Sequence, residues 1–434
     1  MLDQRPTPAA DVLIRGAHVL DPREGLDAKL DVLVRKGEIV DIGENLEAGC
    51  EVIDGTGRHL FPGFVDPHVH LRVPGQEHKE DLDSGTRAAA AGGYVALVAM
   101  PNTSPVVDSA PILRSLRESA RRDARIPVGF LASVTRDLAG EALTEMAELR
   151  ESGALGFTDD GRPVHRAGIL RKALQYQKLC GGIIALHEED PTLSGRGVMH
   201  EGEVSARLGL AGIPSISEST MIARDASLAR YEDGRIHIQH LSARESVEAV
   251  AEAKARGVKI TAEVSPHHLT LTDAVLLESL DTGLKMNPPL RSEADRQALI
   301  AGLKDGTIDC IATDHAPHAR EEKEVPFEEA PMGTTGLETA FAAIYTADVL
   351  PLPLLVEKLS AGAALMGLPT PVIRVGKPAN LALVDLAAEW EVGEAGYESR
   401  AENCCFGGRT LRGKVVTTIA AGGIVYRERV LAPV

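Results

Sequence analysis

The sequence predicts an α/β fold, a (β/α)8 barrel of the TIM type with a small β-sandwich domain built from both ends of the chain. The chain has 434 residues, and a single barrel often needs only about 250. Between residues 61 and 370, short β-branched runs alternate with helical stretches rich in Ala, Glu and Arg, which is typical of parallel βα units. There are eight such runs, the number that closes one barrel.

The eight predicted barrel strands carry polar residues where they end. The strands are expected over residues 61–70, 94–100, 126–134, 154–160, 182–189, 235–240, 259–264 and 309–315. Chemistry in such barrels takes place at the C-terminal ends of the strands. Six of the eight runs place ligand-type or polar side chains at or just after that end: His68 and His70, Asn102, Asp159 and Asp160, His187, His240, and Asp314. A role for these histidines in core packing alone does not predict this placement.

Alternation along a strand selects which of these side chains point inward. Residues two apart share a face, so His68 and His70 can contact one metal ion. Neutral imidazole is a ligand that zinc prefers. In the fourth strand, Asp160 shares its face with small residues that suit the crowded barrel interior, whereas Asp159 shares its face with Leu155 and Phe157. We therefore expect Asp160, and by the same reasoning Asp314, to point inward.

The two ends of the chain have a different pattern. DVLIRGAHVL and KLDVLVRKGEIVDIG near the start, and GKPANLALVDL and GKVVTTIAAGGIVYRERV near the end, alternate with period two and contain turn residues. Neither end has enough strands to be stable alone. We expect residues 1–60 and 371–434 to form one composite β-sandwich domain, with the catalytic barrel over residues 61–370 inserted between them.

The composition of the chain excludes some classes of binding partner and indicates where in the cell the protein is expected. The net charge of −17 argues against a general nucleic-acid or anionic-membrane surface, so neither is expected as a partner. The five cysteines form no CxxC pair, and the start of the chain lacks a signal-peptide pattern. No run of about 18 apolar residues is present. These features predict a cytoplasmic protein with free thiols.

Eight motifs in the same order along nearly the whole chain carry a family resemblance. They are PGFVDPHVHLR, AMPNTSPVVD, GFTDDG, HEED, HIQHLSA, SPHHL, MNPPLR and ATDHAPH. With them the chain resembles the amidohydrolase superfamily and, within it, the bacterial class I dihydroorotases. The resemblance implies a zinc-dependent enzyme that reversibly hydrolyses (S)-dihydroorotate to N-carbamoyl-L-aspartate in pyrimidine (UMP) biosynthesis. It also implies a homo-oligomer, expected to be a dimer, with aspartate transcarbamoylase as a possible partner.

The resemblance assigns six metal ligands for one or two Zn²⁺ per subunit. His68, His70 and Asp314 match the ligands of a first metal, and His187 and His240 match those of a second. Asp160 matches the bridging carboxylate. Hydantoinases and allantoinases use a carboxylated lysine as the bridge, but residues 154–163 contain no lysine. This absence favours the dihydroorotase interpretation over those relatives.

Further residues are predicted to act on the substrate. Asp314 is expected to take a proton from the attacking water and return it to the departing ring nitrogen. Arg72, two residues after His70, can offer a bidentate fork to the substrate carboxylate. The family pattern adds the other predicted substrate contacts, which are His70, Asn102, Asn287, His318, Met332 and Gly333. Met332 stands where the family usually has Phe.

Two alternatives stay open from the sequence. One is a hydantoinase-like or allantoinase-like cyclic amidohydrolase, and the other is an inactive homologue that acts as a scaffold for aspartate transcarbamoylase. A scaffold is expected to have lost ligands, and all six are present. The charged stretch after the eighth strand, residues 315–339, is either an active-site lid or a plain solvated loop.

Overall fold

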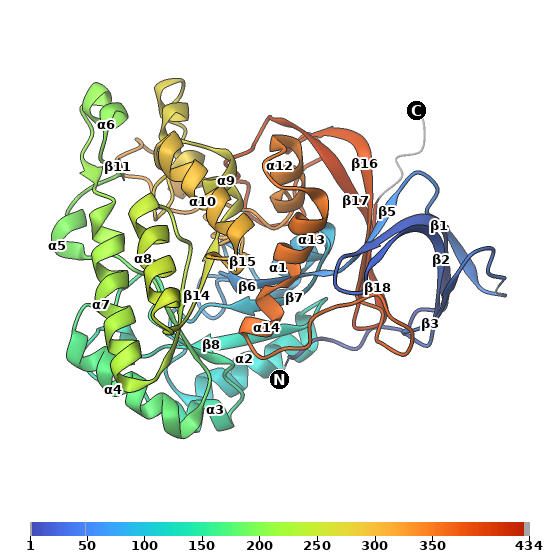
Figure 1. Cartoon of the computed structure of the whole chain (residues 1–434), viewed down its shortest axis with the longest axis horizontal. Helices are drawn as coiled ribbons and strands as arrows, with labels where there is room; N and C mark the ends of the chain where they lie inside the picture. The colour runs from blue at the N-terminus through green and yellow to red at the C-terminus, as the bar shows by residue number, and fades with distance from the viewer. Residues whose placement is uncertain (1, 48, 429–434) are drawn as a thin grey trace.

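A closed parallel barrel forms the larger part of the molecule in a computed structural model that describes residues 2–47 and 49–428. Its strands pair in chain order, and a parallel bridge between Val69 and His315 joins the last strand to the first. The predicted (β/α)8 architecture is confirmed (Figure 1). The strands are β6 (Phe64–Val69), β7 (Tyr94–Ala99), β8 (Val128–Ala132), β9 (Gly156–Thr158), β10 (Ile183–Leu186), β13 (Arg235–Ile238), β14 (Lys259–Val264) and β15 (Cys310–Ile311).

The first predicted strand, residues 61–70, is in fact two strands in two different sheets. β5 (His59–Pro62) pairs with strands of the terminal domain, and β6 begins after Gly63 in the barrel. A Cβ atom at Gly63 would lie 2.2 Å from a methyl carbon of Val95, so only glycine allows the chain to pass β7 this closely. The prediction of one continuous strand was therefore wrong at this point.

Helices cover the barrel and bury its outer apolar face. The shared core consists largely of Ala, Leu, Val and Ile side chains, as the low aromatic content of 3% requires. Helix ends follow local chemistry: Ser292 caps α10 through a reciprocal bond with Asp295, and the helix stops at Gly306, whose φ is +88°. The covering helices are α1 (Leu82–Ala91), α2 (Ala110–Asp123), α3 (Met146–Glu151), α4 (Ala167–Cys180), α7 (Ile216–Glu232), α8 (Arg244–Ala255), α10 (Glu293–Asp305), α12 (Ala340–Ala347), α13 (Leu352–Ser360) and α14 (Gly362–Leu365).

Short elements lie in the long connections between strands and helices. They are α5 (Pro191–Ser194), β11 (Met199–His200), α6 (Glu203–Leu208), β12 (Gly212–Ile213), α9 (Pro266–Thr270) and α11 (Arg320–Lys323), with 3₁₀ turns at Arg136–Leu138, Asp273–Leu277 and Thr282–Leu284. Within the described ranges, no helix has both the length and the apolar character needed to cross a membrane.

The two ends of the chain meet in a second sheet with its own apolar core. Figure 1 shows the blue N-terminal strands beside the red C-terminal ones. Most neighbouring strands are antiparallel, but β4 and β5 run parallel to β1. The strands are β1 (Val12–Asp21), β2 (Leu26–Arg35), β3 (Glu38–Gly43), β4 (Glu51–Asp54), β5, β16 (Leu381–Glu391), β17 (Thr410–Ala420) and β18 (Gly423–Arg427).

Candidate metal centre and substrate cavity

The structure brings the six predicted ligand side chains together at the C-terminal end of the barrel. They follow five strands, β6, β9, β10, β13 and β15, and each of the six residues is at least nine-tenths buried. Parallel strands in a closed barrel end on the same rim, so residues far apart in the sequence converge there. The six residues are His68, His70, Asp160, His187, His240 and Asp314.

Four of these side chains enclose one position. The Nε2 atoms of His68 and His70 lie 3.5 and 3.0 Å from Oδ1 of Asp314. The same two nitrogens lie 3.5 and 3.4 Å from the carboxylate oxygens of Asp160. Ligands about 2.1 Å from a tetrahedral zinc ion are about 3.4 Å from each other. The spacing of these nitrogen and oxygen atoms therefore fits a single divalent ion.

The remaining two histidines define a neighbouring position. Nδ1 of His187 lies 2.9 Å from Nε2 of His240, and these atoms lie 3.8 and 3.7 Å from Oδ1 of Asp160. Asp160 thus faces both ligand sets. Burial would raise its pKa, but His68, His240 and His70 hold it well below the usual range, so the carboxylate is ionised. Asp159 turns away and accepts the backbone N–H groups of Val134 and Thr135.

A buried nitrogen at the centre tests whether a metal fits. Nε2 of His68 is buried, points at the two carboxylates, and has no hydrogen-bond partner among the described residues. Buried polar atoms without partners are rare because each costs free energy. A divalent cation would satisfy this nitrogen and the surrounding oxygens together, so the residues present fit a metal ion.

Three of the four histidines are held by an acceptor on the ring nitrogen that faces away from the centre. Nδ1 of His70 lies 2.9 Å from Oδ1 of Asn102, and Nε2 of His187 lies 3.2 Å from Oε2 of Glu189. Nδ1 of His68 lies 2.6 Å from Oε1 of Glu263. Such contacts orient metal-ligating histidines.

Sequence reasoning missed the two acidic members of this group. Glu189 belongs to the HEED motif, and Glu263 is the one acidic residue in the apolar strand 259–264. A charged residue inside an otherwise buried strand was the available signal. It was not enough to identify the histidine partner, because Glu263 on β14 contacts a side chain of β6, two strands away in the closed barrel.

Three residues at the same end of the barrel have a strained backbone. Arg72, His240 and Asp314 have φ angles of +60°, +32° and +48°, in the left-handed region that residues with a Cβ atom rarely adopt. Such residues persist where surrounding structure enforces them, often at functional sites. Here the turns aim the side chains of His240 and Asp314 into the centre.

A cavity of about 220 Å³ opens over the centre. Pockets for drug-sized ligands measure about 300–1,000 Å³, so this cavity suits a smaller molecule. Of the predicted site residues, His68 lies beneath the cavity and His318 behind it, and neither is part of its wall. The wall consists of His70, Arg72, Asn102, Asp160, Gly161, His187, His240, Asn287, Asp314, Ala316, Met332 and Gly333.

Arg72 is the cation of this cavity, and His318 supports it. Nε of Arg72 donates to the carbonyl oxygen of Pro317 at 2.9 Å, which fixes the guanidinium and leaves most of its terminal N–H groups for a ligand. Nε2 of His318 lies 3.4 Å from Nη2 of Arg72. Burial and the charge of Arg72 lower the pKa of His318 to about 3, so this ring is neutral.

The remaining predicted contacts lie at the rim and already have partners. Nδ2 of Asn287 donates to Glu189 at 2.7 Å. The N–H of Gly333 donates to the carbonyl oxygen of Lys285 at 2.8 Å, and its carbonyl accepts from Asn403. Gly333 has a φ of +141°, and a Cβ atom there would lie 2.9 Å from Ala316. Only glycine fits this position, but its backbone groups would have to exchange partners to contact a substrate.

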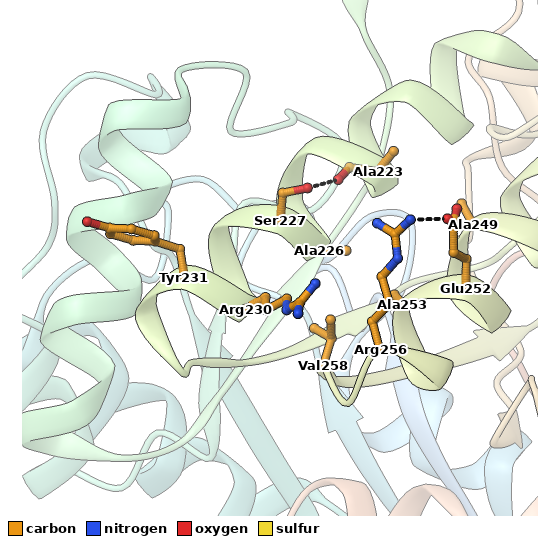
Figure 2. A pocket seen from close by; sticks show the side chains of 10 residues that line it. All are labelled: Ala223, Ala226, Ser227, Arg230, Tyr231, Ala249, Glu252, Ala253, Arg256 and Val258. Carbon is orange, nitrogen blue, oxygen red and sulfur yellow. Dashed lines mark hydrogen bonds and ion pairs between the residues drawn. The ribbon is translucent and has the colours of Figure 1, made fainter.

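A second hollow lies away from the centre, on the outer face between α7 and α8 (Figure 2). Four of its ten lining residues are alanines, Arg256 is paired to Glu252, and Tyr231 lies at the edge. This hollow brings together no group of metal-ligating side chains.

Comparison with known proteins decides the family. The family model described as Dihydro-orotase-like matches residues 57–246. The dihydroorotase of Pelotomaculum thermopropionicum is 45% identical over 97% of this chain and 99% of its own length. The chain belongs to the dihydroorotase family. A dihydroorotase of Anaeromyxobacter dehalogenans is likewise 45% identical, over 96% of this chain and 99% of its own.

Solved structures place this dihydroorotase family member among the amidohydrolases. An L-hydantoinase (dihydropyrimidinase) from Arthrobacter aurescens superposes with a TM-score of 0.85 at 25% identity, covering 97% of each chain. A D-hydantoinase (dihydropyrimidinase) from a Thermus species gives a TM-score of 0.80 at 26% identity, covering 96% of this chain and 95% of its own. The predicted enzyme class, a cyclic amidohydrolase, is therefore confirmed.

Proposed function

We propose that the protein is a zinc-dependent dihydroorotase that reversibly hydrolyses (S)-dihydroorotate to N-carbamoyl-L-aspartate in pyrimidine biosynthesis. One observation supports this substrate above all: a half-buried arginine, Arg72, lines a small cavity together with five of the six proposed ligands. A cyclic amide that also carries a carboxylate matches both halves of this cavity.

The ligand chemistry supports zinc in one or both positions. His68, His70 and Asp314 would hold the first ion, His187 and His240 the second, and Asp160 would lie between them. Histidine nitrogen with carboxylate oxygen is a ligand set that zinc commonly takes. When bound, zinc lowers the pKa of water and polarises a carbonyl oxygen.

Asp314 is proposed as the group that moves the proton. Burial would raise its pKa, but His68 and His70 hold it below the usual range, so it begins as the unprotonated carboxylate that a base must be. It lines the cavity, within reach of an attacking water. Asp314 would accept the proton of that water and pass it to the ring nitrogen as the amide bond breaks.

Arg72 is proposed to bind the substrate carboxylate. The chain carries a net charge of −17, so an anionic substrate needs a local cation. The bond to Pro317 presents the guanidinium edge toward the cavity, where two parallel N–H groups can meet two carboxylate oxygens. Asn102, Asn287, His318, Met332 and Gly333 complete the proposed substrate contacts.

An assay panel with metal analysis tests this function. We expect purified protein to contain zinc and to hydrolyse dihydroorotate at least about 100-fold more efficiently than hydantoin or allantoin. A preference for hydantoin or allantoin would favour the alternative cyclic amidohydrolase. Protein that binds no metal, turns over none of the three substrates and still binds aspartate transcarbamoylase would instead favour the scaffold hypothesis.

The remaining predictions concern the oligomeric state, the protein partner and the location in the cell. Dimer formation and a complex with aspartate transcarbamoylase follow from the family resemblance, whereas a cytoplasmic location follows from the composition. Light scattering of the protein alone and mixed with the transcarbamoylase would measure the first two, and cell fractionation the third.

A further inference from the structure

Glu263 is the penultimate residue of β14 and lies next to the proposed metal centre, in contact with His68. Glu263 is 1% exposed, and both of its carboxylate oxygens contact histidines. Oε1 lies 2.6 Å from Nδ1 of His68, and Oε2 lies 3.0 Å from Nε2 of His237. Oε1 also accepts the backbone N–H of His240 at 3.3 Å. One side chain on β14 thus contacts a proposed ligand of the first metal and the backbone of a proposed ligand of the second.

His237 fixes Glu263 from below. Its other ring nitrogen, Nδ1, lies 2.9 Å from Oγ1 of Thr261, and the ring is fully buried. Thr261, His237, Glu263 and His68 therefore form one hydrogen-bonded row that runs from the barrel floor to the centre. An ionised carboxylate in such a place is costly unless partners surround it, and this row supplies them.

The hydrogen-bonded row determines which ring nitrogen of His68 carries the proton and which carries the lone pair. An ionised carboxylate only accepts hydrogen bonds, so the contact with Glu263 places a proton on Nδ1 of His68. The lone pair is then on Nε2, the atom that points at Asp160 and Asp314 without a hydrogen-bond partner among the described residues. The contact also fixes the plane of the ring.

His237 and Glu263, with Cys310, lie close enough together to be considered a separate ion site. The hydrogen bonds argue against that interpretation. Both oxygens of Glu263 and both ring nitrogens of His237 already have partners in the row. The group is therefore better understood as a support for the metal centre above it.

We propose that Glu263 is a positioning residue that sets the affinity of the first metal position by holding His68 with its Nε2 lone pair toward the ion. The proposal rests on the metal-dependent function proposed above and deepens it. Carboxylates that hold ligating histidines typically contribute 10- to 100-fold in metal affinity. The effect should be selective, because Glu263 touches a ring nitrogen of His68 and only the backbone of His240.

The test is a zinc titration of the metal-free full-length chain against a chromophoric chelator. His187→Ala identifies the second position by abolishing it. We expect Glu263→Gln, which keeps an acceptor oxygen but loses the charge, to weaken the first position about 10-fold, and Glu263→Ala to weaken it about 100-fold. The second position should change by less than about threefold. In the Co²⁺-loaded Glu263 variants, the visible absorption bands of the ion in the first position should differ from those of the parent. The bands of the ion in the second position should stay the same.

Glu338→Gln is the matched control. Glu338 is a largely buried carboxylate that accepts the backbone N–H groups of Glu398 and Ser399, and these hydrogen bonds involve none of the six proposed ligands. Its replacement should leave both zinc affinities unchanged. A folded Glu263→Gln variant that binds the first zinc as tightly as the parent would overturn the proposal. If that parent hydrolyses dihydroorotate, the proposed function would still stand. A parent that binds no zinc would overturn both.

Discussion

Replacing Arg72 by methionine tests the substrate assignment most directly. Methionine keeps much of the buried stem and removes the guanidinium, leaving the substrate carboxylate without its cation. Because Nε is engaged by Pro317, the terminal N–H groups are the ones available for the ligand. Truncating one partner of a buried, hydrogen-bonded charge pair costs about 2–5 kcal/mol. At about 1.4 kcal/mol per tenfold, this predicts a KM for dihydroorotate that rises from about 30-fold to a few thousand-fold.

Steady-state kinetics with dihydroorotate would measure the effect, with thermal unfolding to check that the variant folds. We expect kcat to change much less than KM, because Arg72 acts on the carboxylate and not on the bond that breaks. Arg320→Met is the matched control. It removes the same charge from α11, where the Arg320 side chain is 79% exposed. A KM within twofold of the parent for Arg72→Met would remove this residue from the substrate site.

Three further predictions address proton transfer by Asp314, the contact between Lys323 and the loop at Pro331, and the dependence of stability on pH. Asp314→Asn should lower kcat by about 100-fold or more while substantial zinc stays bound; near-native turnover would refute a proton-transfer role. Lys323→Met should lower Tm and raise KM, because Nζ of Lys323 holds the carbonyl of Pro331 at 2.7 Å, next to the cavity wall; unchanged values of both would show that this contact is dispensable. Burial and Arg291 lower the pKa of His200 from 6.5 to about 4. The unfolded chain therefore takes up this proton first, and stability should fall by up to about 3 kcal/mol from pH 6.5 toward pH 4. His200→Gln should flatten that slope in urea titrations, and an equally steep slope would contradict the assignment.

The barrel was predictable because its strands have a simple apolar pattern. The predicted strand 259–264 has the bounds of β14. The predicted strand 309–315 contains only the two residues of β15, since Asp314 adopts a positive φ that turns the chain out of extended geometry. Sequence patterns report burial and do not report where a functional residue bends the backbone.

The sequence allowed the proposed ligands of the candidate site to be predicted, but not the side chains that hold those ligands in place. Period-two alternation correctly aimed Asp160 inward and Asp159 away from the centre. The contact between Glu263 and His68 joins side chains from β14 and β6. Which histidine Glu263 contacts depends on how the closed barrel aligns these strands. That alignment is a property of the tertiary structure, so the supporting layer could not be derived from local pattern.

The split at Gly63 has a consequence for the order of events during synthesis. β5 continues directly into the strand that carries His68, and its partner on one side is β16, where His59 aligns with Val384. Ribosomes add about 5–20 residues per second, so β5 leaves the ribosome long before β16 exists. One edge of β5 is unpaired throughout that interval. The first proposed metal ligands along the chain are thus anchored on one side by strands that are made almost last, and a nascent chain completes this anchor only when its synthesis is nearly over.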